Sequence, residues 1–162
     1  MLAFINQNET RTLQMKRITA PLILSALTFC GIANAEGIRT PDEVVAHMVE
    51  GVDHVDNAYV QERMKANPDL LLLDVRTVPE FKAGRIEGAT NVPRGVVEFR
   101  MADGNYSSDQ EIIVTCSMGY RAADVTKTLE EMGYTNVRAH RGTRSWQEAE
   151  LPFDPPPAED DE

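Results

Sequence analysis

Two short apolar runs most constrain how this chain can fold. The first run, Leu70–Leu73, ends at Asp74, and the second lies in Glu111–Thr115, directly before Cys116. Continuous apolar runs of this length are typical of strands that are buried on both faces, as in a parallel sheet. Helical patterns separate the two runs, so the sequence predicts an α/β fold with a central, mostly parallel sheet and helices on both faces.

Local start and stop motifs place the remaining elements. Thr40-Pro41-Asp42-Glu43 combines an N-cap threonine, a proline at the first helical position and a capping-box glutamate. Valines recur at helical spacing up to Val55, which predicts an N-terminal helical addition over residues 36–55. Further helices are predicted over Asp56–Ala66, Thr77–Gly84, Val96–Met101 and Arg121–Gly133, and further strands over Ala89–Val92 and Asn136–Ala139.

The first 35 residues have the layout of a secretory signal peptide. Met15-Lys16-Arg17 is a short basic start, Ile18–Ile32 is apolar, and Ala33-Asn34-Ala35 is an A-x-A cleavage motif. We expect residues 1–14 to be an upstream extension, cleavage after Ala35, and a periplasmic or secreted protein. An uncleaved N-terminal anchor is the alternative, although the apolar run is short for a membrane span.

The net charge of the chain limits the classes of partner that it is expected to bind. Residues 1–35 contain three basic residues and one acidic residue, so their removal changes the net charge from −10 to −12. Such an acidic protein is not expected to bind nucleic acid or, after cleavage, an anionic membrane. At the other end, residues 153–162 are rich in proline and acids and predict a disordered tail.

The cysteines point to a reactive thiol. Cys30 leaves with the N-terminal segment, so the mature chain keeps Cys116 alone and has no internal disulfide. Cys116 follows a predicted strand and precedes a turn and a helix, where open α/β sheets bind their ligands. The alternative is that Cys116 is a structural, unreactive cysteine at the end of a strand.

The loop after the cysteine favours an anion. In Cys116-Ser117-Met118-Gly119-Tyr120-Arg121, Gly119 permits a tight turn whose backbone N–H groups face the sulfur. The following helix N-terminus and Arg121 add positive charge, so we expect the thiolate form to be favoured.

Several motifs, in order, resemble the rhodanese family over residues 56–152. These are Leu72-Leu73-Asp74-Val75-Arg76, Glu80-Phe81, Gly84-x-Ile86-x-Gly88-Ala89, Cys116-x-x-Gly119-x-Arg121 and Gly142-x-x-x-Trp146 followed by Leu151-Pro152. Two positions depart from the family pattern: Arg141 replaces a glycine, and Arg85 stands where histidine is usual.

The resemblance implies a sulfurtransferase. Cys116 would take sulfane sulfur from a small anionic donor such as thiosulfate, hold it as a persulfide, and pass it to a thiol or cyanide acceptor. The loop amides of Ser117 to Arg121 would bind the sulfur anion, and Arg121 would also meet the donor's charge. Arg141 and Arg144 are further candidate substrate contacts. No metal site and no cofactor are expected, and the oligomeric state is open.

Other roles compete for these residues. A cysteine loop closed by arginine also suits a phosphatase or an arsenate reductase of the same fold, and a rhodanese-like module can carry sulfur slowly or bind a partner without catalysis. His140 is expected to be a polar strand-end residue, because the loop needs no general base. Asp74 and Arg76 are expected to fix the loop after their strand.

Overall fold

The computed structural model describes residues 37–155 as seven helical segments and seven strands. The helical segments are α1 (Pro41–Val49), α2 (Asn57–Ala66), α3 (Val78–Lys82), the 3₁₀ helix η1 (Arg94–Val96), α4 (Val97–Asp103), α5 (Tyr120–Glu131) and α6 (Thr143–Glu148). The strands are β1 (His54–Val55), β2 (Leu71–Asp74), β3 (Arg85–Ile86), β4 (Thr90–Asn91), β5 (Ile112–Thr115), β6 (Val137–His140) and β7 (Phe153–Asp154). Within these residues, no helix is both long enough and apolar enough to cross a membrane.

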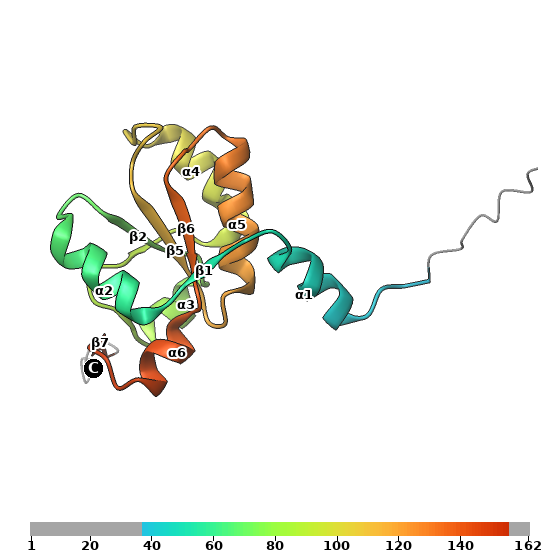
Figure 1. Cartoon of the computed structure of the whole chain (residues 1–162), viewed down its shortest axis with the longest axis horizontal. Helices are drawn as coiled ribbons and strands as arrows, with labels where there is room; N and C mark the ends of the chain where they lie inside the picture. Colours follow the sequence, from blue (N-terminus) through green and yellow to red (C-terminus); the bar gives the residue numbers. More distant parts are fainter. Residues whose placement is uncertain (1–36, 156–162) are drawn as a thin grey trace, which may run out of the picture. The chain divides into compact units, whose positions relative to one another are not determined.

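A five-stranded parallel sheet organises the fold, with the strand order β1-β6-β5-β2-β4 (Figure 1). Strand β5 is central, and its Thr115 pairs in register with Asp74 of β2. The side chains of β2 and β5 are buried throughout, as the continuous apolar runs predicted. Parallel strands need crossover connections, and here helices supply several of them.

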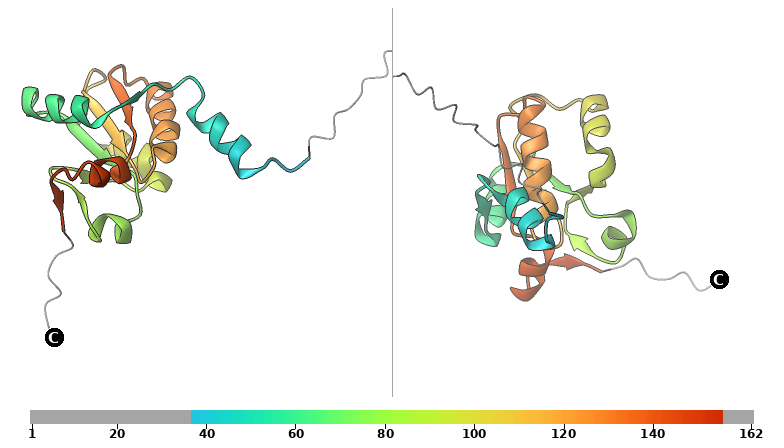
Figure 2. Two further views of the ribbon diagram at one scale, coloured as in Figure 1. Left: turned by 60° about the horizontal axis from the view of Figure 1, so that its bottom comes forward. Right: turned by 90° about the vertical axis from the view of Figure 1, so that its right-hand side faces the viewer.

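The sheet carries one apolar core on each face, because successive side chains of a strand point to opposite sides. On one face, Leu73 and Val114 pack with residues of α4 and α5. On the other face, Leu72 and Ile113 pack with Val60 of α2, with Trp146 of α6, and with β3. Figures 1 and 2 show these helices on opposite sides of the sheet, which confirms the expected α/β arrangement.

The predicted helix starts are confirmed by side-chain caps. Thr40 and Glu43 form a capping box at α1, and Thr77 and Glu80 form another at α3. Asp56 caps α2 by accepting a hydrogen bond from the backbone N–H of Tyr59 at 2.9 Å. These caps satisfy amide donors that have no partner inside a helix.

The expected helical addition over residues 36–55 is wrong beyond Val49. The chain leaves α1 through a turn in which Gly51 has a φ of 74°, and His54–Val55 then forms β1 beside β6. The valine spacing suits a helix, but β6 offers an open edge whose backbone groups need partners. Strand pairing therefore determines the conformation of residues 54–55.

The expected disordered tail over residues 153–162 is wrong at its start. Phe153–Asp154 pairs antiparallel with Arg85–Ile86, and Phe153 packs into the core that contains Trp146. The indole N–H of Trp146 donates to the carbonyl of Pro152 at 2.8 Å, which ties this segment down. The predicted signal peptide and the rest of the tail, residues 156–162, lie outside the described residues.

Candidate functional site

Cys116 lies at the carboxyl end of β5, one residue beyond the last paired position. Its side chain is 2% exposed and packs in the core on the α5 side of the sheet. Its carbonyl accepts a hydrogen bond from the backbone N–H of Thr143 at 2.7 Å. The thiol is free of any disulfide. The sheet therefore fixes the backbone before this cysteine, and the start of α6 fixes its carbonyl.

The chain turns from β5 into α5 within the cysteine loop, residues 116–121. Gly119 makes the turn with a φ of 85° and is the N-cap of α5. Its carbonyl accepts the first hydrogen bond of the helix, from the N–H of Ala123 at 2.9 Å. A left-handed turn that leads into a helix N-terminus presents free backbone N–H groups to an anion. The predicted loop geometry is confirmed at Gly119.

A second glycine lets another segment contact the cysteine loop directly. Gly142, between β6 and α6, has a φ of 109°, and a Cβ there would lie 2.5 Å from the carbonyl oxygen of Ser117. The N–H of Arg144 donates to that oxygen at 3.1 Å. A side chain at position 142 would push the two backbones apart. Gly142, the glycine of the closing motif, therefore allows the backbone before α6 to contact the backbone of the cysteine loop.

Arg121 holds the loop through Glu80, a carboxylate that the sequence placed at a helix start and in a motif of the family resemblance, without a contact to the cysteine loop. Its Nη1 and Nη2 donate to Oε2 and Oε1 of Glu80 at 3.0 and 2.8 Å, and Nη2 also donates to Ser117 Oγ at 2.9 Å. The hydroxyl of Ser117 donates to Glu80 at 3.2 Å. The capping motif gave Glu80 a sufficient local role and so concealed this contact.

The ion pair between Arg121 and Glu80 shifts the pKa values of both side chains. Hydrogen bonds from Arg121 hold the pKa of Glu80 well below its usual range. The same bonds raise the pKa of Arg121, with a smaller contribution from the nearby Cys116. Arg121 thus keeps its positive charge beside the cysteine, but it shares that charge with Glu80.

Asp74 and Arg76 form the structural unit that was predicted at the end of β2. The carboxylate of Asp74 is fully buried and accepts hydrogen bonds from Nε and Nη2 of Arg76, the shortest at 2.7 Å. The remaining donors of Arg76 reach the carbonyls of Glu80 and Gly84. Arg76 therefore fixes the position of α3, and with it the position of Glu80.

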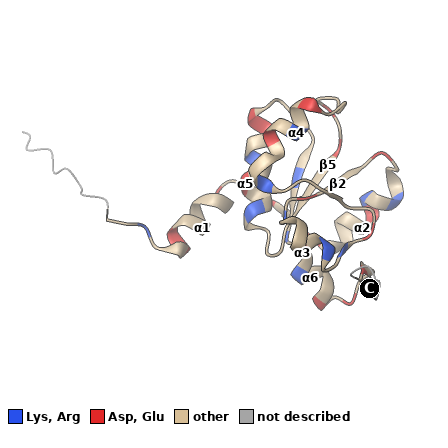
Figure 3. Cartoon of the chain, turned by 180° about the vertical axis from the view of Figure 1, so that it is seen from behind, with Lys and Arg blue, Asp and Glu red and all other residues tan. Residues whose placement is uncertain are grey.

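The other arginines are placed differently from one another. Arg94 pairs with Asp124, with Nε 2.6 Å from the carboxylate. Arg144 is exposed and contacts the cysteine loop through its backbone N–H. Arg141 is exposed, and it lines a pocket beside the loop. Basic segments around α3 and α6 are visible in Figure 3.

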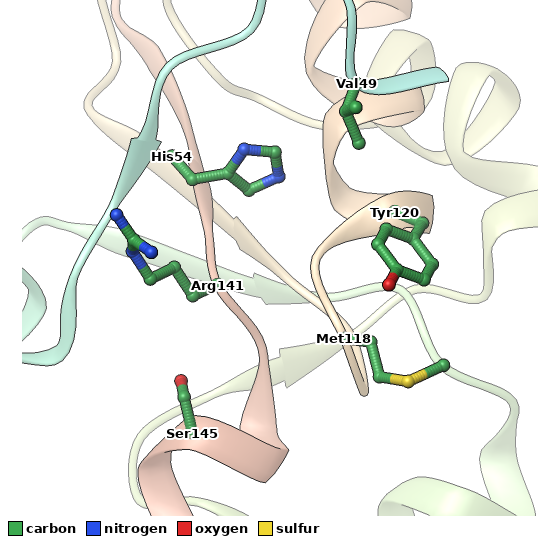
Figure 4. Close-up of a pocket in the computed structure, with 6 residues that line it drawn as sticks. All are labelled: Val49, His54, Met118, Tyr120, Arg141 and Ser145. Carbon is green, nitrogen blue, oxygen red and sulfur yellow. The ribbon is translucent and has the colours of Figure 1, made fainter. Parts of the chain in front are cut away.

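The pocket beside the loop has a volume of about 510 Å³ and is open to solvent. Its lining residues come from α1, β1, the cysteine loop and the segment around α6, and they are Val49, His54, Met118, Tyr120, Arg141 and Ser145. In Figure 4, Met118 and Tyr120 lie on one side of the pocket, and His54 and Arg141 lie on the other. The structure thus brings three of the predicted site residues, Met118, Tyr120 and Arg141, into one cavity.

His54 is a site residue that the sequence analysis missed. It was assigned to the N-terminal helix, but it opens strand β1, and its Nε2 donates to the carbonyl of Gly119 at 3.1 Å. A Cβ at position 119 would lie 3.1 Å from the His54 ring, so the imidazole fits against a glycine. Gly51 was the sequence feature that could have ended the helix earlier.

His140 is a structural residue, as predicted. Its ring is fully buried, donates from Nε2 to Asn57 Oδ1 at 2.8 Å, and accepts from the hydroxyl of Thr115 at 3.0 Å. Burial lowers the pKa of His140 to about 4, so the ring is neutral at pH 7. Among residues 37–155, no three His, Cys, Asp or Glu side chains are grouped as a metal site would need.

Known proteins resemble this chain in sequence and in fold. A sulfurtransferase of Allochromatium vinosum is 28% identical over 103 residues, which cover 63% of this chain and 94% of the relative. The human thiosulfate:glutathione sulfurtransferase is 32% identical over 92 residues, 49% of this chain and 80% of the relative. The polysulfide-sulfur transferase homodimer of Wolinella succinogenes has a similar structure, with a TM-score of 0.62, 25% identity and coverage of 75% and 90%.

Residues 56–149, from the cap of α2 through the cysteine loop to the end of α6, match the model of the rhodanese-like domain. This match covers more than half of the chain and includes the resemblance motifs from Leu72 to Trp146. The chain belongs to the rhodanese-like domain family.

Proposed function

We propose that this protein is a sulfurtransferase that carries sulfane sulfur from thiosulfate to a thiophilic acceptor on Cys116. The placement of Cys116 carries the proposal: it ends a central strand, and a left-handed turn into the N-terminus of α5 follows it. Relatives named as sulfurtransferases support the same chemistry.

The first step transfers one sulfur atom to the enzyme. The Cys116 thiolate attacks the outer sulfur of thiosulfate, the S–S bond of the donor breaks, and its electron pair leaves with sulfite. The product is a Cys116 persulfide anion, so charge and electrons balance. Backbone N–H groups of the loop would stabilise the anionic sulfur before and after transfer.

The second step returns the enzyme to its starting state. A nucleophilic acceptor attacks the outer sulfur of the persulfide, the S–S bond to Cys116 breaks, and the thiolate is regenerated. This is covalent, ping-pong catalysis. His140 takes no part, because its nitrogens bind Asn57 and Thr115.

Loop length favours sulfur over phosphoryl transfer. Four residues separate Cys116 from Arg121, and Arg121 is tied to Glu80 across the loop. A phosphate group needs several oxygens among the loop amides, whereas a persulfide adds a single sulfur. The short, tied loop suits the smaller group.

The test compares the wild type with Cys116→Ser. After incubation with thiosulfate, mass spectrometry of the wild type should show one added sulfur atom on Cys116. Repeated release of sulfite should then require cyanide, which removes that sulfur as thiocyanate. Cys116→Ser should lose this activity by about 10³-fold or more while its circular dichroism spectrum stays unchanged. Hydrolysis of an aryl phosphate through Cys116 that is faster than sulfur transfer would overturn the proposal.

We also propose that the mature protein is exported and begins at Glu36, because the A-x-A motif Ala33-Asn34-Ala35 follows a basic and an apolar segment. N-terminal sequencing of protein from the periplasm or medium tests this. Recovery in membranes only, with residues 15–35 intact, would contradict it.

A further inference from the structure

The pocket beside the cysteine loop has a wall that the family match does not include. Val49 and His54 line the pocket, yet both precede residue 56, where the match to the rhodanese-like domain begins. His54 also donates to the carbonyl of Gly119, so this wall contacts the cysteine loop itself. The pocket is therefore partly built by a segment that lies outside the matched domain.

The lining combines a cation with apolar surface. Among residues 37–155, no carboxylate lines the pocket, although the chain carries a net charge of −10. Arg141 is the permanent cation, and no ion pair occupies its guanidinium within the described part of the chain. Arg76 and Arg121, by contrast, are both paired with carboxylates.

The apolar part of the pocket includes two residues of the cysteine loop. Met118 and Tyr120 belong to the cysteine loop and are 42% and 38% exposed, so they present apolar surface to the pocket. Cys116 itself is 2% exposed, so a second substrate must approach it along the loop. A volume of about 510 Å³ suits a small molecule, because such sites usually measure about 300–1,000 Å³.

We infer that this pocket binds the sulfur acceptor and selects a small organic thiol that carries a carboxylate. Arg141 binds the carboxylate, and Met118, Tyr120 and Val49 contact the hydrocarbon part. His54 is a positioning residue, which holds Gly119 and closes the pocket on the β1 side. The inference rests on the proposed function, because it names the acceptor for the Cys116 persulfide.

The transfer step requires no further reactant. The acceptor thiol bonds to the outer sulfur of the persulfide as the S–S bond to Cys116 breaks. The electron pair of that bond returns to Cys116 as a thiolate, and the acceptor leaves as an organic persulfide that carries the thiol proton or releases it to water. Sulfur is moved, and no net oxidation occurs.

The experiment discharges a preformed Cys116 persulfide with three small thiols of different charge. The probes are 3-mercaptopropionate, which is anionic, 2-mercaptoethanol, which is neutral, and cysteamine, which is cationic. The single-turnover rate is measured against probe concentration for the wild type and each variant. A variant-to-wild-type ratio is taken for each probe, so differences in thiol acidity between probes cancel.

Arg141→Ala should raise the half-saturating concentration of 3-mercaptopropionate by about tenfold, because one charge-assisted contact is lost. The ratio for 2-mercaptoethanol should stay within about twofold, and Arg141→Lys should restore part of the loss. Arg138→Ala is the matched control, because Arg138 is exposed at the other end of β6 and its removal changes the net charge equally. Equal losses for all three probes, or the same loss in Arg138→Ala, would overturn the inference.

Failure of the proposed function gives a different result. If thiosulfate forms no persulfide on the wild type, sulfur transfer is wrong and the pocket is tested by binding alone. The probe is then 3-(methylthio)propionate, an unreactive thioether, added to Cys116→Ser while the methyl resonance of Met118 is followed by NMR. Saturable binding that Arg141→Ala weakens supports the carboxylate site, and binding that Arg141→Ala leaves unchanged overturns it.

Discussion

The ends of β2 and β5 lie side by side, and the segment that follows each of them contains a guanidinium bonded to a carboxylate. At the end of β2, Arg76 uses its donors on the fully buried Asp74 and on two backbone carbonyls. Beyond the end of β5, in the first turn of α5, Arg121 binds Glu80, and the two side chains are 32% and 37% exposed. One pair is sealed inside the protein, while the other lies at its surface beside Cys116.

The difference shows how one chemistry serves two purposes. In a buried ion pair whose donors are all hydrogen-bonded, the side chains fix the backbone and leave no group free to bind a ligand. Removing one partner leaves an unpaired charge in a medium of low dielectric constant. A half-exposed pair is screened by water, so it orients the cysteine loop with little effect on overall stability. The end of β6, on the other side of β5, resembles the end of β2. Its last residue, His140, is buried like Asp74, and both of its ring nitrogens form hydrogen bonds.

The largest effect is expected when the sealed pair is broken. Arg76→Ala should lower the free energy of unfolding by about 3–5 kcal/mol, because Asp74 keeps a buried carboxylate without its partner. Urea denaturation at pH 7 measures this. Arg85→Ala, which removes a half-exposed pair with Asp154, is the control and should lose no more than about 1 kcal/mol. Similar losses in both variants would erase the distinction between sealed and exposed pairs.

The buried end of β6 should make stability depend on pH. The pKa of His140 is lowered to about 4 by burial, so its contribution is complete above the unfolded value of about 6.5 and is lost as pH falls toward 4. The wild type should lose on the order of 3 kcal/mol over this range.

His140→Gln tests the origin of that dependence. The variant cannot titrate in this range, so its stability should change less between pH 7.5 and pH 4.5 than that of the wild type. His47 and His54 remain in both proteins and serve as internal controls. An unchanged slope in urea denaturation against pH would assign the dependence to other groups.

A methyl group at position 142 tests how the cysteine loop is held. Gly142→Ala should cost about 1–3 kcal/mol, because the residue has a φ of 109° and the new Cβ meets the backbone of Ser117. The rate of sulfur transfer should fall even under conditions in which Gly142→Ala is fully folded, because the displaced segment is the cysteine loop. Gly133→Ala is the control: its φ is 100°, but nothing lies near its Cβ. Equal loss of activity in both variants would mean that backbone strain alone is responsible.

The smallest effect is expected at the exposed pair. Glu80→Gln should lower stability by about 1 kcal/mol or less at pH 7. Because the pKa of Glu80 is lowered well below its usual range in the folded protein, its contribution is complete above the unfolded value of about 4.3 and is lost progressively as pH falls from there through the lowered folded value. The difference in stability between the two proteins should therefore narrow as pH falls below 4 and as salt is added. A difference that does not narrow between pH 5 and pH 3 would show that charge is not the cause.

The sequence by itself determined the elements whose energy is local. Capping residues such as Thr40 and Asp56 satisfy amides within one turn of their own helix, and the β2 and β5 runs are apolar enough to need burial on both faces. The position of Cys116 followed directly, because the end of a strand is visible in the sequence.

Only the tertiary structure decided which distant groups meet. Glu80 reaches Arg121 because Arg76 sets the position of α3, and His54 reaches Gly119 because β6 leaves an edge open for β1. Phe153 leaves the predicted tail for a comparable reason, since Gly84 leaves space where its ring packs. Local patterns contain no record of these partners: the free energy of an open sheet edge, a shared cavity or an ion pair depends on surfaces that exist only after the chain has folded.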